Sequence, residues 1–152
     1  MAGRVRTTEL AALIRQGGPF SAGSSVTGEE IIESITQVLR QYAHPQFVTV
    51  MVSESVTQSY DGVEGFKEAW SDWVSPYAGF RIEFDEVAQL DDRLLFLVRQ
   101  VATTQHNTVE IETPSAAVWW LEDGQIRQAA FYLDRRAGMT AAGFEPDRPS
   151  TG

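Results

Sequence analysis

The segment from Ser115 to Arg136 constrains the fold more than any other part of the sequence, because it predicts two long strands, a sharp turn between them and a following helix. Gly124 can adopt a left-handed backbone conformation without a Cβ clash, and Asp123 before it tolerates turn geometry. The residues on either side of Glu122-Asp123-Gly124 are β-branched, aromatic or small, as strands favour. A β-hairpin that reverses at this point is therefore expected.

The length of the turn decides which residues pair across this hairpin. A three-residue loop closed by a glycine bulge, the reading that we favour, places Trp119 opposite Arg127. Further along, the same register places Ser115 opposite Phe131. A two-residue Asp-Gly turn would shift the pairing by one residue and exchange the faces. Both faces are apolar or aromatic and need cover, with Trp119, Ala117 and Phe131 on one and Trp120, Val118 and Tyr132 on the other.

The rest of the chain predicts helices first and consecutive strands afterwards. Thr27 to Glu30 reads as a capping box, so a helix begins there and runs until His44-Pro45. Residues 17–28 are rich in glycine and serine and are expected to form a surface loop that Phe20 and Val26 could pin, and the polar residues 53–62 are expected to be turn-like. Further helices are expected at 7–14, 63–75 and 135–141, the last capped by Asp134, and strands at 47–52, 80–87, 94–104, 109–121 and 126–134.

This order of elements indicates a single α+β domain, a curved antiparallel sheet with helices packed on one face. Residues 1–43 are expected to supply the N-terminal helices and the Gly/Ser-rich loop, residues 44–144 the sheet and helix core of the same domain, and residues 145–152 a disordered tail. A length of 152 residues fits one hydrophobic core and leaves little room for a second.

Charge and composition exclude several classes of function. A net charge of -9 and a pI near 4.6 oppose binding to nucleic acid or to an acidic membrane, and the 12 basic residues are scattered. The absence of cysteine excludes thiolate chemistry, and His44 and His106 lack metal-binding spacing, so neither a metal nor another cofactor is expected. Without a signal-peptide pattern or a run of ~18 apolar residues, a soluble cytoplasmic protein is expected.

Several short motifs, in this order, resemble SnoaL-like proteins, which belong to the superfamily of nuclear transport factor two and the ketosteroid isomerases. The resemblance implies a cone, in which helices close the concave face of a strongly curved sheet around a deep apolar pocket for a polycyclic, terpenoid or steroid-like molecule. It also implies a homodimer through the outer sheet face. It covers roughly His44 to Phe144 and is carried by Gly62 to Phe66 opening a helix, Ala117-Val118-Trp119 before the turn, and Tyr132-Leu133-Asp134 leading to Ala141 to Phe144.

The resemblance also implies where acid and base groups would lie, and this sequence has no carboxylate there. The acid/base aspartate of the SnoaL-type cyclases corresponds to Ala117, and that of the limonene epoxide hydrolase type to Phe131. The arginine of the hydrolase corresponds to Arg99, but the aspartate two residues beyond it becomes Val101. Such enzymes rely on a pocket carboxyl whose pKa is raised by desolvation. Neither arrangement can therefore be carried over to this chain.

Arg99 is the sharpest remaining candidate for a polar contact, because a guanidinium that faces inward needs a carboxylate or an anionic ligand group. Alternatively, it points outward and pairs with an exposed carboxylate such as Glu83. Two tryptophans can be both core and pocket wall, and two tyrosines could aim hydroxyls at a ligand. The candidate ligand-binding residues are Tyr42, Tyr60, Trp70, Trp73, Arg99, Ser115, Trp119 and Phe131, and no catalytic residue is assigned.

Three kinds of function fit these features. The chain can be a proton-transfer enzyme of the cyclase, isomerase or hydrolase type with a non-standard site, which predicts a buried titratable group with a perturbed pKa in the pocket. It can be a pocket protein that binds a ring-bearing metabolite without turnover. It can also be a protein-interaction module, which would need an exposed apolar patch. The sequence decides neither between turnover and binding nor which hairpin face lines the pocket.

Overall fold

One seven-stranded sheet organises the protein. The computed structural model describes residues 5–6, 9–12, 23, 25–53, 56–106 and 109–144. The strand order in the sheet is β1-β4-β5-β6-β7-β2-β3. The elements are β1 (Ser25–Thr27), α2 (Gly28–Tyr42), β2 (Ala43–Val52), β3 (Thr57–Asp61), α3 (Gly62–Val74), β4 (Gly79–Leu90), β5 (Arg93–Thr103), β6 (Glu110–Glu122), β7 (Gln125–Tyr132) and α4 (Arg135–Ala142).

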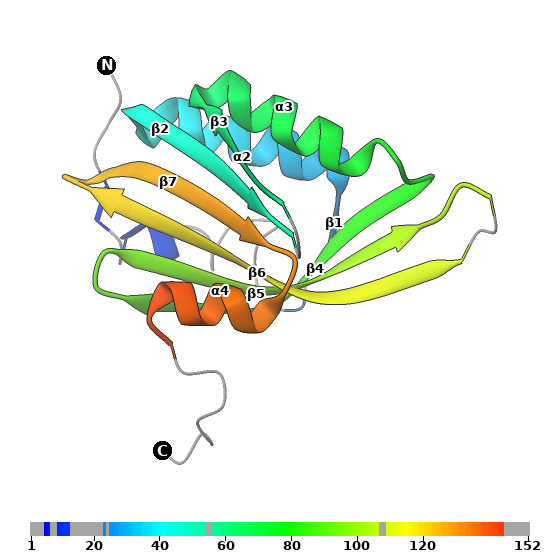
Figure 1. Ribbon diagram of the computed structural model, residues 1–152. Coiled ribbons are helices and arrows are strands. Elements are labelled where there is room, and N and C mark those ends of the chain that lie inside the picture. Colours follow the sequence, from blue (N-terminus) through cyan, green and yellow to red (C-terminus); the bar gives the residue numbers. More distant parts are fainter. Residues whose placement is uncertain are drawn as a thin grey trace, which may run out of the picture.

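The helices divide between the two faces of the sheet. Helices α2 and α3 cover one face, and the C-terminal helix α4 crosses the other (Figure 1). Ile31, Ile35 and Leu39 of α2 are buried against the sheet, together with Phe66 and Trp70 of α3. The main hydrophobic core therefore lies between α2, α3 and the concave face, which confirms the expected α+β architecture. The expectation that the helices pack on one face is wrong for α4, which covers the apolar residues Ala116 and Val118 of the outer face.

The sheet is mixed rather than wholly antiparallel. Strand β2 runs parallel to β7, whereas every other neighbouring pair is antiparallel. The expectation of an antiparallel sheet rested on consecutive strands joined by short turns, and β2 is not consecutive with β7. Register shifts occur in β4 after Phe84 and in the β6–β7 pair after Trp120. Bulges of this kind bend a strand and increase its twist, and so help the sheet to curve.

The turn between β6 and β7 has two residues, not the three that we favoured. Asp123 and Gly124 both have positive φ angles, 52° and 77°, and Glu122 pairs with Gln125. This is the backbone pattern of a type I′ turn. The bulge then adds one residue to β7, so that Ala117 pairs with Phe131. The predicted pairs are therefore wrong, because Trp119 lies opposite Ala129 rather than Arg127, and Phe131 lies opposite Ala117 rather than Ser115. The turn and the bulge together shift the register by two residues, an even number, so the predicted division of the two faces is confirmed.

Only some of the predicted helix caps form hydrogen bonds in the structure. Thr27 Oγ1 accepts from the Glu30 amide at 3.2 Å and Glu30 Oε1 from the Thr27 amide at 3.0 Å, so the predicted capping box is present. Asp134 stands at the N-cap of α4 but makes no capping hydrogen bond through its side chain, contrary to expectation. Gly143 ends α4 in the left-handed conformation.

Two segments that were expected to be loops contain strands. Residues 57–61 form β3 on the outer side of β2, and residues 25–27 form β1 on the outer side of β4. Both are short and polar edge strands, so their composition resembles that of turns. Val26 is buried and pins its segment, as predicted. Residues 9–12 are helical, and the expectations for Phe20, for residues 13–14 and for the tail 145–152 lie outside the described residues.

Helix α4 approaches the outer sheet face most closely at Gly138. A Cβ atom at this position would lie 2.6 Å from the Cβ of Ala116 and 3.3 Å from the Cβ of Tyr132. Ala116, Val118 and Leu95 form a second small core beneath the helix. The backbone of α4 can therefore contact the sheet only because residue 138 has no side chain.

Gly138→Ala is expected to destabilise the protein by about 1–3 kcal/mol, because the added methyl group overpacks this contact. Elsewhere in a helix the same change stabilises by about 0.5–1 kcal/mol. Urea denaturation followed by circular dichroism measures the difference. Thr140→Ala, at an exposed position of the same helix, is the control and should change stability little. A Gly138→Ala variant as stable as the parent would contradict the close packing of α4.

Candidate functional site

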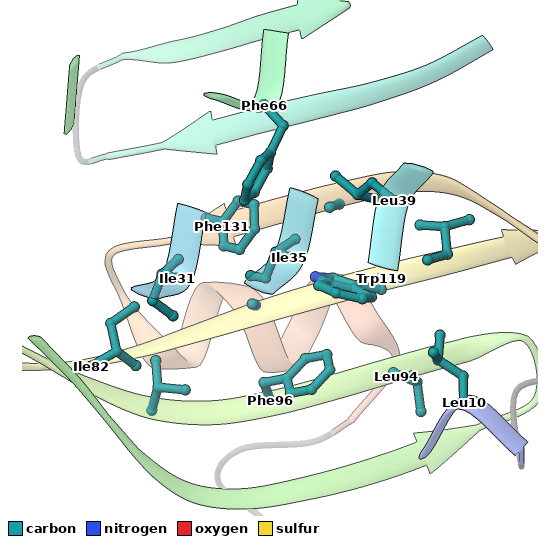
Figure 2. Close-up of a cluster of buried hydrophobic side chains, with 14 of the residues drawn as sticks. Leu10, Ile31, Ile35, Leu39, Phe66, Ile82, Leu94, Phe96, Trp119 and Phe131 are labelled. Atoms are coloured by element: carbon teal, nitrogen blue, oxygen red, sulfur yellow. The ribbon is translucent and has the colours of Figure 1, made fainter. Parts of the chain in front are cut away.

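A small cavity lined by buried side chains lies between the concave face of the sheet and helices α2 and α3. Its volume is about 30 Å³, room for about two water molecules. Figure 2 shows the side chains of this region, which converge from α2, β4, β5, β6 and β7. The cavity is lined by Ile31, Ile35, Trp70, Ile82, Phe84, Phe96, Val98, Gln100, Ala116, Ala117, Trp119 and Phe131.

The cavity is much smaller than the deep pocket that the resemblance implied, because aromatic rings fill the concavity. Trp70 meets Phe131 edge-on with ring centroids 5.1 Å apart, and Phe66 reaches Phe131 at 6.1 Å. On the opposite wall, Phe96 packs on Trp119 at 5.2 Å. A ring-bearing ligand would therefore have to displace some of these side chains.

Three of the predicted ligand-binding residues, Trp70, Trp119 and Phe131, line the cavity. All three are buried, and they come from α3, β6 and β7. The hairpin face that carries Trp119, Ala117 and Phe131 is thus the one that faces the cavity. The opposite hairpin face, with Val118, contributes to the core beneath α4.

The other uncharged candidates lie outside the cavity wall. Ser115 is fully buried, and its hydroxyl donates to the carbonyl oxygens of Leu133 and Thr113, at 2.9 and 3.2 Å. Tyr60 donates its hydroxyl to Gln58 at 2.9 Å, and Tyr42 packs half-buried against the core. Burial, followed by the nearby charges of Asp72 and Glu68, raises the pKa of Tyr60. These side chains serve packing or local hydrogen bonds.

Trp73 does not line the cavity but is hydrogen-bonded to a residue that does. Its indole nitrogen donates to the side-chain oxygen of Gln100 at 2.9 Å, and Gln100 lines the cavity. The sequence reasoning missed Gln100 because it considered the neighbouring arginine instead. The strand alternation was the signal that could have found it, since Arg99 and Gln100 must point to opposite faces of β5.

Arg99 lies on the outer face of the sheet and does not reach the cavity. Its guanidinium contacts Glu112 at 2.8 Å, Glu83 at 3.0 Å and Asp85 at 3.0 Å. The outward alternative, with Glu83 as partner, is therefore correct, and the inward position as a ligand contact is wrong. The hydrogen bond to Glu112, then that to Asp85, raises the pKa of Arg99 further above its ordinary value.

The contacts of Asp85 extend this network to helix α4. Arg135 at the start of α4 donates to Asp85 at 2.7 Å and to the carbonyl oxygen of Val98 at 2.6 Å. Burial alone would raise the pKa of Asp85, but hydrogen bonds from Arg135 and Arg99 outweigh burial and lower it. The network therefore holds α4 against strands β4 and β5.

Asp85→Asn is expected to cost about 1–2 kcal/mol at pH 7, because it removes the charge from two charge-assisted hydrogen bonds. Since the folded-state pKa of Asp85 is lowered, its stabilisation is complete above the unfolded pKa of roughly 4 and is lost as pH falls further. Urea denaturation of both proteins at several pH values measures the difference. A difference that persists undiminished at pH 2–3 would contradict the role of the charge; Asp72→Asn, exposed on α3, is the control.

The positions where relatives would place acid/base carboxylates do face the cavity. Ala117 and Phe131 are paired across β6 and β7, and both belong to the cavity wall. No lining residue is titratable at ordinary pH, since the wall is aliphatic or aromatic apart from Gln100 and the two indoles. The buried titratable group that an enzyme reading predicted is therefore not found in this wall. Among the described residues, no group of three or more His, Cys, Asp or Glu could hold a metal ion.

None of the helices in the described part of the chain has the length and apolar character needed to cross a bilayer.

The fold is similar to those of several solved structures. A candidate SnoaL-like polyketide cyclase from Jannaschia sp. CCS1 superimposes with a TM-score of 0.60 at 16% identity, covering 96% of this chain and 99% of that one. TerC, co-crystallised with polyporic acid, gives 0.55 at 14% identity, covering 76% and 90%. A protein of ketosteroid isomerase-like fold from Catenulispora acidiphila, in complex with trimethylamine, gives 0.54 at 10% identity, covering 75% and 86%.

Sequence comparison gives the family directly. No curated protein matches the sequence. The family model for the SnoaL-like domain matches residues 34–129, a region that begins within α2 and ends in β7. It contains α3, the two strands that pair with β7, which are β2 and β6, and most of the cavity wall. With the concave aromatic site and the mixed sheet in place, this match shows that the chain belongs to the SnoaL-like domain family.

Proposed function

We propose that this protein binds a small apolar, ring-bearing molecule in the concave cavity and does not convert it by acid–base chemistry. The observation that carries the proposal is the composition of the cavity wall, which is buried, almost wholly apolar and free of titratable groups. Proton transfer needs a group whose pKa lies near the working pH, within hydrogen-bond reach of the substrate. Ala117 and Phe131 supply no such group.

Two structural neighbours support a small-molecule site at the level of the fold. TerC was co-crystallised with polyporic acid, and the Catenulispora protein was crystallised in complex with trimethylamine. Both chains share the sheet and helix arrangement of this protein. The aromatic rings that now fill the concavity would then act as movable walls, and a ligand would take the place of one of them.

Binding of indane, a hydrocarbon of two fused rings, tests the proposal. We expect isothermal titration calorimetry to give saturable binding, and the melting temperature to rise with indane concentration by mass action. Ala117→Leu, which fills the cavity wall, should abolish both effects, whereas the similar change Ala137→Leu on exposed α4 should not. Absence of any binding by the parent protein would refute the proposal.

Turnover is tested with any small molecule that remains bound to the protein through purification. Native mass spectrometry of the protein as isolated reports bound small molecules and the number of subunits together. Incubating any recovered molecule with fresh protein and analysing it by liquid chromatography should return it unchanged. A product that forms only with the protein would replace binding with catalysis as the function.

The homodimer through the outer sheet face and the cytoplasmic location stay predictions. Helix α4 covers one part of the outer face, and the ion pairs of Arg81 and Arg99 with acidic neighbours cover another. A partner subunit would have to contact these two regions. The same mass spectrum that detects a ligand would report the dimer.

A further inference from the structure

Two tryptophans in the cavity wall bury indole N–H groups that have no hydrogen-bond partner. Trp70 and Trp119 are 1% and 3% exposed, and neither Nε1 atom meets an acceptor. Trp73 differs, because its indole nitrogen donates to Gln100. Figure 2 shows the nitrogen of Trp119 at the end of the ring that points toward Ile35, another residue of the wall. Within the described part of the chain, the buried unpaired indoles are thus those of the two cavity tryptophans.

Such an arrangement is unfavourable for the protein alone. An indole N–H is only a donor, and leaving a buried donor unpaired loses the hydrogen bond that it made to water in the unfolded chain. Phenylalanine at either position would supply a similar ring without this loss. The hydroxyls of Thr36 and Thr49 are also unpaired, but these residues do not line the cavity.

The remaining polar group of the cavity wall is also a donor. The side-chain oxygen of Gln100 already accepts from Trp73, which occupies one of its two lone pairs, and its amide nitrogen is a further donor for a ligand. The wall contains no carboxylate, imidazole, ammonium or guanidinium. It therefore offers mainly uncharged hydrogen-bond donors, and its one side-chain acceptor is already shared with Trp73.

We infer that the molecule bound in this cavity is neutral and carries an acceptor oxygen, as a ring ketone or quinone does, which receives the indole N–H of Trp70 or Trp119. This inference rests on the proposed function and specifies its ligand class. An anion would find no cation in the wall, and a cation no carboxylate. An alcohol or amine would bring a hydrogen for which the wall offers only the oxygen of Gln100, which is already bonded to Trp73. A carbonyl satisfies the donors and keeps the rest of the molecule apolar.

Indane and 1-indanone provide a matched test, because they share one ring skeleton and differ by a carbonyl oxygen. Calorimetry should show that 1-indanone binds about tenfold more tightly than indane, a difference of about 1.4 kcal/mol. In ¹H–¹⁵N spectra of the indole groups, 1-indanone should move the Trp70 or Trp119 proton downfield, as a new hydrogen bond does, while indane should not.

Variants test whether the two indoles cause the preference for 1-indanone over indane. The double change Trp70→Phe with Trp119→Phe should lower the affinity ratio of 1-indanone to indane to about one, while indane still binds. Trp120→Phe, on the opposite hairpin face, should keep the ratio of the parent. Equal affinity for the two compounds in the parent protein would overturn the inference and leave the proposed function intact. Failure of both compounds to bind would refute the proposed function itself.

Discussion

Ala117→Asp, which restores a carboxyl group at the position where cyclase relatives carry one, is expected to cost roughly 3–5 kcal/mol at pH 7. Residue 117 is buried in the cavity wall, and its neighbours there are apolar. Desolvation would raise the folded-state pKa of the new carboxyl above its unfolded value of roughly 4. Below pH 4 both states would hold the proton, so the penalty should be smallest there and should grow as pH rises toward the folded-state pKa.

Urea denaturation of this variant and of the parent protein between pH 3.5 and pH 8 measures the penalty. Ala137→Asp, at an exposed position of α4, adds the same charge without burial and should show a small penalty at every pH. A penalty for Ala117→Asp that does not depend on pH would mean that the carboxyl group reaches water, and would contradict a buried apolar cavity.

Phe131→Ala is expected to destabilise the protein by about 3–5 kcal/mol, because it removes a buried ring and leaves a larger cavity. The ring contacts both Trp70 and Phe66, which come from the helix layer over the sheet. The same change removes the side chain that most directly occupies the concavity. Indane at a fixed concentration should therefore raise the melting temperature of Phe131→Ala more than that of the parent protein.

Differential scanning calorimetry with and without indane measures both parts of this prediction. Tyr77→Ala is the control, since Tyr77 is an exposed aromatic residue that stacks on Phe80 outside the cavity. It should cost less than about 1 kcal/mol and leave the response to indane unchanged. If indane stabilises Phe131→Ala no more than the parent protein, Phe131 does not control the space in which the ligand binds.

The hairpin illustrates how far the sequence predicted the fold. Alternation of apolar residues around Asp123-Gly124 correctly predicted two strands, a turn and the division of side chains between the faces. The turn length and the individual pairs were wrong, and the faces were right only because a bulge after Trp120 shifts the register by a second residue. A bulge depends on the pairing of two complete strands, so no local pattern in this sequence indicates it.

The strands β2 and β3 show a second limit. Local composition does not reveal that β2 lies parallel to β7, because the two strands are distant in the sequence and are held together by the sheet. Thr57 to Asp61 resembles a turn in composition, and it becomes a strand because β2 offers it a hydrogen-bonding edge. Tertiary pairing overrides intrinsic preference in both cases.

The sequence predicted several residues of the candidate site but not the small volume of its cavity. Trp70, Trp119 and Phe131 were identified from the resemblance and from the hairpin pattern, and they line the cavity. Arg99 was a candidate because a guanidinium in the middle of a strand would need a carboxylate or an anionic ligand group if it faced inward, but the strand alternation turns Gln100 inward instead. The small volume follows from how the rings of α3, β6 and β7 interdigitate, and packing of that kind is set by three-dimensional contacts rather than by residue type.

The parallel neighbour of β2 has a consequence for biosynthesis. Strand β2 leaves the ribosome long before β7, and until Gln125–Tyr132 has been made one of its edges has no native partner. Pairing between distant segments forms slowly, and an unpaired edge can join a second nascent chain in the meantime. We therefore expect the nascent chain to associate with other chains most readily before β7 has been made.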